Sequence, residues 1–336
     1  MHSLTAEVAI IGAGTAGCFI GSLLDEAGLD CLLIEKSRGL GGRCSRRRVS
    51  SEYGVDLGAP EFSLDKASHP RLKQKIESWV SAGYLSSWTK SVSRFDTHID
   101  QHTMKSSLCG SPSMSSWHKN IAGHLNILTQ SRVHKIERTQ NKWHLFDDKH
   151  QLIAVTNKVV ITAPPEQAID LLSPVIGFNY SRDLPVESLP QYVCAIGFKA
   201  STNIRSDAYE GGHSQLYRAI RETSKPSRNC PPTMKEVWLV HSTHEWAQAQ
   251  AHADSEEAAI ALTQAFCQHF GTQAQGHPLT SHYWRMARYK SVPQNYPPLI
   301  WDEALQVGCC GDWLGRSGTA GALNSALALH QTIMGI

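Results

Sequence analysis

The order of apolar runs and of a helically periodic segment over the first 35 residues predicts a strand–helix–strand unit. Residues 8–11 and 31–34 are continuous apolar runs, and residues 18–27 between them have helical periodicity. Short apolar runs of this kind, bounded by glycine or polar residues, are typical of buried parallel strands. The pattern therefore predicts a βαβ unit.

The same reasoning extends along the rest of the chain. Helical periodicity predicts further helices over residues 65–83, 113–124, 254–270 and 323–333. Alternating or continuous apolar runs predict strands over residues 131–138, 142–146, 152–155, 159–163, 192–198, 236–242, 282–289 and 304–313. Residues 86–109 are polar and irregular, with brief alternation that suggests strands, and the three prolines of residues 223–233 predict a surface loop.

The turn between the first strand and helix has the spacing of a dinucleotide-binding loop. Gly12 permits a tight turn, Gly14 lets the backbone approach a pyrophosphate, and Gly17 allows the helix to pack closely on the strand. Glu35 follows the second strand, about 20 residues downstream, where an acid meets a ribose hydroxyl. The alternative is a glycine-rich turn in an ordinary α/β domain.

Composition narrows the classes of partner. The chain has 336 residues, 41% apolar and 18% charged, with a net charge of +2. This balance gives no reason to expect a nucleic acid or an anionic membrane as a partner. No stretch approaches the roughly 20 apolar residues of a membrane span, and the apolar run near the start is the dinucleotide strand rather than a signal peptide.

The cysteines and histidines predict neither disulfides nor a metal site. Nine cysteines are scattered without C-x-x-C spacing, which favours reduced thiols and a cytoplasmic location. Seventeen histidines include one close pair, His241 and His244, without a supporting cluster of Cys or carboxylates. We therefore expect no metal.

Two further segments resemble FAD enzymes of the glutathione-reductase and amine-oxidase type. After Glu35, the chain continues through Gly41-Gly42-Arg43, which resembles the E-x-x-x-x-x-G-G-R segment of that superfamily. Near the other end, Gly311-Asp312 and then Gly321-Ala322 resemble its second FAD signature. The resemblance implies that Arg43 pairs with the pyrophosphate, that Asp312 takes a ribityl hydroxyl, and that the last helix points its N-terminus at the flavin.

The FAD-contacting positions implied by these motifs form one set. They are Gly12, Ala13, Gly14, Thr15, Ala16, Gly17, Glu35, Lys36, Arg43, Ala59, Pro60, Val133, Gly311, Asp312, Gly321 and Ala322. Val133 is expected near the adenine, where its backbone offers hydrogen bonds.

Over nearly its full length the chain resembles bacterial renalase-type flavoproteins. The segments that carry this resemblance are residues 35–43, 56–59, 224–226, 238–246, 282–288 and 311–313. The family implies non-covalent FAD, oxidation of 2- or 6-dihydro isomers of NAD(P)H, O2 as acceptor and hydrogen peroxide as product. The chain departs from the family at Pro60, Glu61, Met286, Gly318 and Ala320.

We accordingly expect an α/β fold: a Rossmann-type FAD domain with a β-meander insertion, and an α+β substrate domain with a mainly antiparallel sheet. The FAD domain is assigned to residues 1–60, 115–165 and 300–336, and the substrate domain to residues 61–114 and 166–299. A dihydronicotinamide needs orientation more than a dedicated base, because it becomes aromatic when it loses hydride.

The sequence leaves alternatives open for the substrate contacts and for the reaction. Trp284 is expected to stack on the substrate ring and Arg288 to contact an anion, or else Trp284 is core and Arg288 a surface ion-pair partner. Glu61 is either an acid or base beside the flavin or a rim residue. The rival functions are a flavin amine oxidase or desaturase for another small metabolite, and a catalytically silent FAD-binding protein that acts through a partner.

Overall fold

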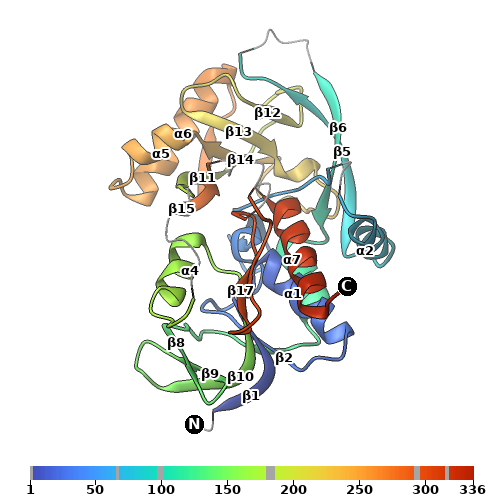
Figure 1. Ribbon diagram of the computed structural model, residues 1–336. Helices are drawn as coiled ribbons and strands as arrows, with labels where there is room; N and C mark the ends of the chain where they lie inside the picture. Colours follow the sequence, from blue (N-terminus) through green and yellow to red (C-terminus); the bar gives the residue numbers. More distant parts are fainter. Residues whose placement is uncertain (1–2, 66–67, 97–101, 179–185, 291–295, 315–317) are drawn as a thin grey trace.

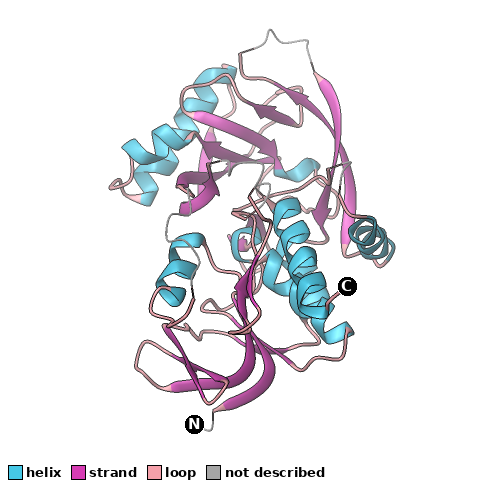
Figure 2. Ribbon diagram, in the orientation of Figure 1, coloured by secondary structure: helices cyan, strands magenta, loops and turns pink. Residues whose placement is uncertain are grey.

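The computed structural model describes residues 3–65, 68–96, 102–178, 186–290, 296–314 and 318–336. It is a mixed α/β structure built around two large sheets, as expected from the sequence (Figure 2). The sheet of the dinucleotide motif occupies the lower half of Figure 1 and the second sheet the upper half. Among the described residues, no helix combines the length and the apolar character that crossing a membrane requires.

The first sheet has eight strands, and its central part is parallel. Six strands lie in the order β16 (Ile300–Asp302), β17 (Val307–Cys309), β10 (Leu152–Ile161), β1 (Leu4–Ile11), β2 (Cys31–Ile34) and β7 (Asn126–Leu128), and the other two, β8 (Lys135–Thr139) and β9 (Lys142–Phe146), branch from β10. Helices α1 (Thr15–Glu26) and α7 (Thr319–Met334) pack against each other beside this sheet (Figure 1). Strands β1, β10 and β17, from distant parts of the sequence, thus end at one edge.

The meander is confirmed, with two corrections: the strand expected at 131–138 begins at residue 135, and two of the expected strands are one. Strands β8 and β9 pair antiparallel, and Gln140 and Asn141 turn with φ of 50° and 61°. Positive φ at both central residues is what a tight hairpin turn requires. The expected strands at 152–155 and 159–163 are instead the single strand β10, which pairs with β9 in its first half and with β1 along its length.

The second sheet has seven strands and is antiparallel except between β12 and β5. Its order is β15 (Gly276–Tyr289), β11 (Ser188–Phe198), β14 (Glu236–Ser242), β13 (Leu216–Arg221), β12 (Ala208–Glu210), β5 (Leu85–Ser93) and β6 (Thr103–Gly110). The segment 86–109, which looks irregular in sequence, contributes the hairpin of β5 and β6. Polar side chains on an edge hairpin hide its strand pattern.

The two faces of the second sheet bury different clusters. Tyr192, Cys194 and Ile196 pack on the side of α5 (His244–Ala249) and α6 (Ser255–Phe270). Val193 and Ala195, on the other face of β11, belong to the cluster that also contains residues of α1 and α7. This second face therefore looks toward the dinucleotide motif.

The remaining elements connect these layers. Helices α2 (Pro70–Ser81), α3 (Met114–Ala122) and α6 confirm the expected helices, with Ser113 and Asp254 accepting backbone hydrogen bonds at the starts of α3 and α6. Helix α4 (Pro165–Leu172), α5, β12 and β13 are further elements that the sequence pattern does not single out. Strands β3 (Arg46–Arg48) and β4 (Gly54–Asp56) form a small separate hairpin.

Candidate functional site

The glycine turn has the geometry that its spacing predicts. Gly12 has φ of 104°, and a Cβ on Gly17 would lie 1.9 Å from the carbonyl oxygen of Gly12. Gly17 thus permits the contact between helix and strand. Gly14 caps the start of α1, and a Cβ there would meet nothing within 4 Å. The space in front of α1 is open, and free N–H groups at a helix N-terminus attract phosphate.

Glu35 holds the glycine turn in place through its side chain. Its carboxylate accepts hydrogen bonds from the backbone N–H of Ala13 at 2.8 Å and of Ser37 at 2.7 Å. The backbone oxygen of Glu35 accepts a bond from the N–H of Ser131, which brings the segment before Val133 alongside. Each carboxylate oxygen keeps a second lone pair for a ribose hydroxyl.

The second glycine segment folds over the first. The N–H of Gly41 donates to the oxygen of Ala13 at 2.8 Å, and a Cβ on Gly42 would lie 3.3 Å from the Cα of Gly14. Close approach at this point explains the glycine. The segments that the sequence separates by some 25 residues are therefore one loop system.

Arg43 joins this loop system to the other end of the chain. Its guanidinium donates to both carboxylate oxygens of Asp312, at 2.9 and 2.5 Å, and stacks 5.0 Å from the centroid of the Tyr289 ring. Burial alone would lower the pKa of Arg43, but Asp312 raises it above its usual range. The two residues assigned to different parts of FAD are thus direct partners.

The C-terminal signature adjoins this ion pair. The N–H of Gly311 donates to the Ser325 hydroxyl at 2.9 Å, and the N–H of Gly318 lies 3.4 Å from Asp312 Oδ2. Helix α7 begins at Thr319, not at residue 323 as the sequence pattern predicts, so Gly321 and Ala322 lie in its first turn. The small residues at 318–322 disguise this turn in the sequence because they give no helical periodicity.

The N-termini of α1 and α7 meet at a buried cluster that the sequence analysis missed. Cys44 Sγ lies 3.7 Å from the hydroxyls of both Thr15 and Thr319. His118 contacts the Thr15 hydroxyl at 2.9 Å and the Met114 carbonyl at 2.8 Å, and burial lowers the pKa of this histidine to about 4. No motif spacing links His118 to the glycine turn, because α3 lies some 100 residues later.

The segment after β4 lies between the two sheets. The N–H of Ala59 donates to the oxygen of Arg43 at 2.8 Å, and a Cβ on Gly58 would fall 1.7 Å from that oxygen. Pro60 follows as a buried residue. Lys36, which follows Glu35 in the same loop system, donates to Gln167 of α4 at 3.1 Å.

Glu61 is buried and ion-paired. Its carboxylate contacts the ammonium of Lys90, the guanidinium of Arg218 and the hydroxyl of Ser107. These three partners occupy both oxygens of the carboxylate and leave little room for it to act on a substrate. The rim alternative for Glu61 does not describe this buried position, and its partners argue against the acid–base alternative.

Trp284 and Arg288 both lie on β15, but a bulge separates them. Trp284 faces Gln191 of β11 and Arg288 faces Leu189, so three residues of β15 lie opposite one of β11 between these pairs. Trp284 Nε1 donates to the oxygen of Leu57 at 2.6 Å, in the turn that precedes Ala59. Arg288 donates to the Tyr217 hydroxyl at 3.1 Å and lies 4.6 Å from the centroid of that ring.

The loop with three prolines is not a surface excursion throughout. Lys225 is buried and Arg228 is half-buried with a 5% exposed side chain, and each contacts both Asp56 and Glu222 at distances from 2.6 to 3.3 Å. Burial alone would raise the pKa of Asp56, but Lys225 and Arg228 hold it below its usual value. The prolines give no sign of this network, because one of its carboxylates, Asp56, comes from β4, far away in the sequence, and the other, Glu222, immediately precedes the loop.

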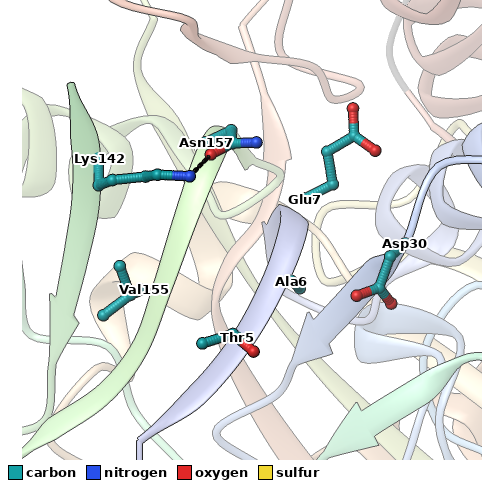
Figure 3. Close-up of a pocket in the computed structure, with 7 residues that line it drawn as sticks. All are labelled: Thr5, Ala6, Glu7, Asp30, Lys142, Val155 and Asn157. Carbon is teal, nitrogen blue, oxygen red and sulfur yellow. Dashed lines mark hydrogen bonds between the residues drawn. The ribbon is translucent and has the colours of Figure 1, made fainter.

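A surface pocket at the opposite end of the first sheet has different chemistry. Its lining comes from the starts of strands and their connections: Thr5, Ala6, Glu7, Asp30, Lys142, Val155 and Asn157 (Figure 3). Lys142 donates to Asn157 across it. Ligands of open parallel sheets bind at the carboxyl ends of the strands, so this pocket lies away from the place where a dinucleotide is expected.

Comparisons with known proteins agree with this geometry at the level of fold. Residues 10–74 match the family model of the NAD(P)-binding Rossmann-like domain. A triple mutant of putrescine oxidase, made in a redesign of cofactor binding, is 12% identical over 99% of this chain and 100% of that one, with a TM-score of 0.71.

Two further solved structures are similar. Wild-type putrescine oxidase bound to putrescine is 11% identical, covers 100% of both chains and has a TM-score of 0.68. A protein of Exiguobacterium sp. 255-15, provisionally assigned as a protoporphyrinogen oxidase, is 13% identical over 99% of each chain with a TM-score of 0.70. The chain therefore has a Rossmann-like domain within a fold shared with these proteins.

Proposed function

We propose that the protein is an FAD-dependent oxidoreductase that takes hydride from a small reduced substrate. The observation that carries this proposal is the direct pairing of Arg43 with Asp312, which unites the two FAD-type signatures in one place. The shared fold of putrescine oxidase over the full chain supports it.

The residues present fit FAD. Gly14 leaves open space before α1 for a pyrophosphate, and Glu35 has lone pairs free for a ribose. Arg43 pairs with Asp312, which lies beside Gly318 at the start of α7. Bound FAD would supply a two-electron acceptor at flavin N5. The start of α7 would stabilise negative charge on the flavin ring and so favour its reduced state.

Within this class, the resemblance to renalases points to 2- or 6-dihydro isomers of NAD(P)H as substrates, with O2 as acceptor. The pairing of Glu61 supports such a reaction, because a dihydronicotinamide loses hydride without needing a base. Trp284 and Arg288 are the proposed substrate contacts. Trp284 Nε1 donates to the oxygen of Leu57, in the turn expected beside the flavin, so Trp284 holds β15 of the second sheet against that turn.

Amine oxidation is the second candidate, because putrescine oxidase shares the fold. An amine must lose a proton before hydride transfer, so its rate would rise with pH through the pKa of the amine. A catalytically silent FAD protein is the third candidate.

The test is anaerobic mixing of the FAD-loaded protein with partly borohydride-reduced NAD(P)+, with ordinary 4-dihydro NAD(P)H and with a panel of amines. We expect rapid bleaching of the flavin by the first mixture and slow bleaching by the second. Bleaching by an amine alone would replace the dihydronicotinamide proposal with the amine one. No bleaching by any of them would contradict both and leave the silent protein.

A further inference from the structure

One face of the second sheet carries an excess of positive charge. Arg218 faces His241 across β13 and β14, and His241 faces Val193 of β11. Gln191, two residues from Val193, faces Trp284, and Leu189 faces Arg288. Residues two apart on a strand share a face. We call the face that bears Gln191, Arg218, His241, Trp284 and Arg288 the substrate face.

The substrate face looks toward the expected flavin position. Val193 and Ala195 share it and pack in the cluster that includes residues of α1 and α7. Trp284 reaches Leu57 and Arg218 reaches Glu61, so residues 57–61 lie against it at two points. A ligand held here would be close to the turn that follows β4.

The cations of this face exceed the anions. Glu61 is shared between Lys90 and Arg218, and Glu210 lies 4.0 Å from Arg218 while also pairing with Lys105. Arg288 is half-buried, and its partner is the phenol of Tyr217. Within the described part of the chain, no carboxylate lies within 4 Å of the Arg288 guanidinium.

Two further features fit an anion at this place. Burial and the nearby charge of Arg288 lower the pKa of Arg218 to about 10. Two guanidinium groups that repel each other are both stabilised by an anion placed between them. Arginine also provides paired donors that match the geometry of a carboxylate or a phosphate.

His241 supplies an unused polar atom on the same face. It is 3% exposed, and its Nε2 has no hydrogen-bond partner among the described residues. Gln191 donates its amide to the Ser242 oxygen, so its own oxygen faces His241 Nδ1 at 3.4 Å. This arrangement favours the proton on Nδ1 and leaves Nε2 as an acceptor.

We propose that Arg218 and Arg288 form an anion-binding subsite for a carboxylate or phosphate group of the substrate, and that His241 Nε2 accepts a hydrogen bond from the same ligand. The inference rests on the proposed function for the identity of the ligand as substrate. It excludes a small dication such as putrescine as the preferred ligand, because that ligand would meet two guanidinium groups.

The test is calorimetric titration of the FAD-loaded protein at low ionic strength with benzoate, inorganic phosphate and benzylammonium. We expect benzoate, phosphate or both to bind, and benzylammonium not to bind. Benzoate alone would identify a carboxylate and phosphate alone a phosphate ester. No anion binding, or tighter binding of benzylammonium, would overturn the subsite.

Substitutions of single residues test whether the anion binds at this subsite. Arg288→Gln should weaken anion binding by tenfold to a hundredfold, the range expected for a lost charge-assisted pair. Tyr217→Phe should weaken it by only twofold to fivefold, because it keeps the ring beneath Arg288. The matched control is Arg285→Gln, an exposed arginine of the same strand, which should leave binding unchanged.

Equal anion affinity in Arg288→Gln and in the native protein would overturn the proposal even if anions bind. Bound FAD, read from absorbance, is measured separately in every variant. Full FAD content without anion binding would refute the subsite and leave the proposed cofactor standing. Anion binding that depends on Arg288 in a protein that takes up no FAD would refute the proposed function and leave the subsite standing.

Discussion

Two charged clusters of this protein differ in how well their charges balance. The network of Asp56, Glu222, Lys225 and Arg228 has two anions and two cations, and all four side chains are at most 5% exposed. On the substrate face, Lys90 and Arg218 share Glu61, and Arg288 has only a phenol. In the first cluster every charge has a partner of opposite sign within the cluster. The second cluster needs an added anion to balance its cations.

This difference in charge balance indicates a structural role for the first cluster and a binding role for the second. A buried charge without a partner is costly, so a closed network ties the segments that contribute to it. Here the balanced network joins β4 to the loop after β13. In an unbalanced cluster the unpaired charge destabilises the free protein, and a ligand of opposite charge removes this destabilisation when it binds. Such clusters are common in binding sites.

The largest expected effect comes from unbalancing the closed network. Asp56→Asn leaves Lys225 and Arg228 with Glu222 alone and should lower the free energy of unfolding by about 3–5 kcal/mol. Urea denaturation measures the change. Asp148→Asn, at an exposed site, is the control and should stay within about 0.5 kcal/mol. A loss below about 1 kcal/mol at Asp56 would show that the network does not stabilise the fold.

Two glycines of the same turn should respond differently. Gly17→Ala places a methyl group on the Gly12 oxygen and should cost about 3 kcal/mol of stability. Gly14→Ala meets open space at φ of −76°, so the protein without cofactor should keep its stability within about 0.5 kcal/mol. Its FAD affinity should fall at least about tenfold, because the methyl group occupies the space of the pyrophosphate.

Urea denaturation without cofactor and fluorescence titration with FAD read these two quantities separately. Native FAD affinity in Gly14→Ala would place the pyrophosphate elsewhere.

The glycines also show how far the sequence predicts the site. Gly12, Gly14 and Gly17 could be read directly, because backbone geometry at a turn is local and only glycine meets it. The same holds for the Asp254 cap of α6. That Arg43 and Asp312 lie in one site could be expected only through family resemblance, since 269 residues separate them. The resemblance assigns them to different parts of FAD, so their direct pairing was not predicted.

His118, Glu61 and the Asp56 network were missed or misjudged for a physical reason. Each depends on which distant segments meet, and hydrophobic periodicity reports only which side of one segment is buried. Lys225 and Arg228 looked exposed because charged residues usually are, and only their partners make burial tolerable.

A smaller effect is expected from acid. The pKa of His118 is lowered to about 4 in the folded protein, so between about pH 6.5 and 4 the unfolded chain binds a proton that the folded chain does not. Stability should therefore fall as pH falls, with a contribution from His118 of about 2 kcal/mol by pH 5.

Denaturation of the native protein and of His118→Gln at pH 7 and pH 5 isolates the contribution of His118 to the pH dependence of stability. The variant should lose about 2 kcal/mol less than the native protein on acidification. Equal losses would mean that His118 is already protonated in the fold or is exposed there.

The smallest effect falls on the unbalanced cluster. Without a ligand, Arg288→Gln removes a repulsion from Arg218 and should change stability by less than about 1 kcal/mol, in the stabilising direction. Chemical denaturation of the two proteins in dilute buffer checks the sign. A loss as large as that of Asp56→Asn would make Arg288 part of a closed structural network and erase the contrast between the clusters.

The central claim is that both ends of the chain hold one FAD. The most direct measurement is the cofactor content of the purified protein after incubation with FAD and gel filtration, with identification of the flavin released by heat. We predict one FAD per chain, released without covalent attachment. A protein that retains no flavin under these conditions, or that binds NAD(P) in place of FAD, would contradict the account.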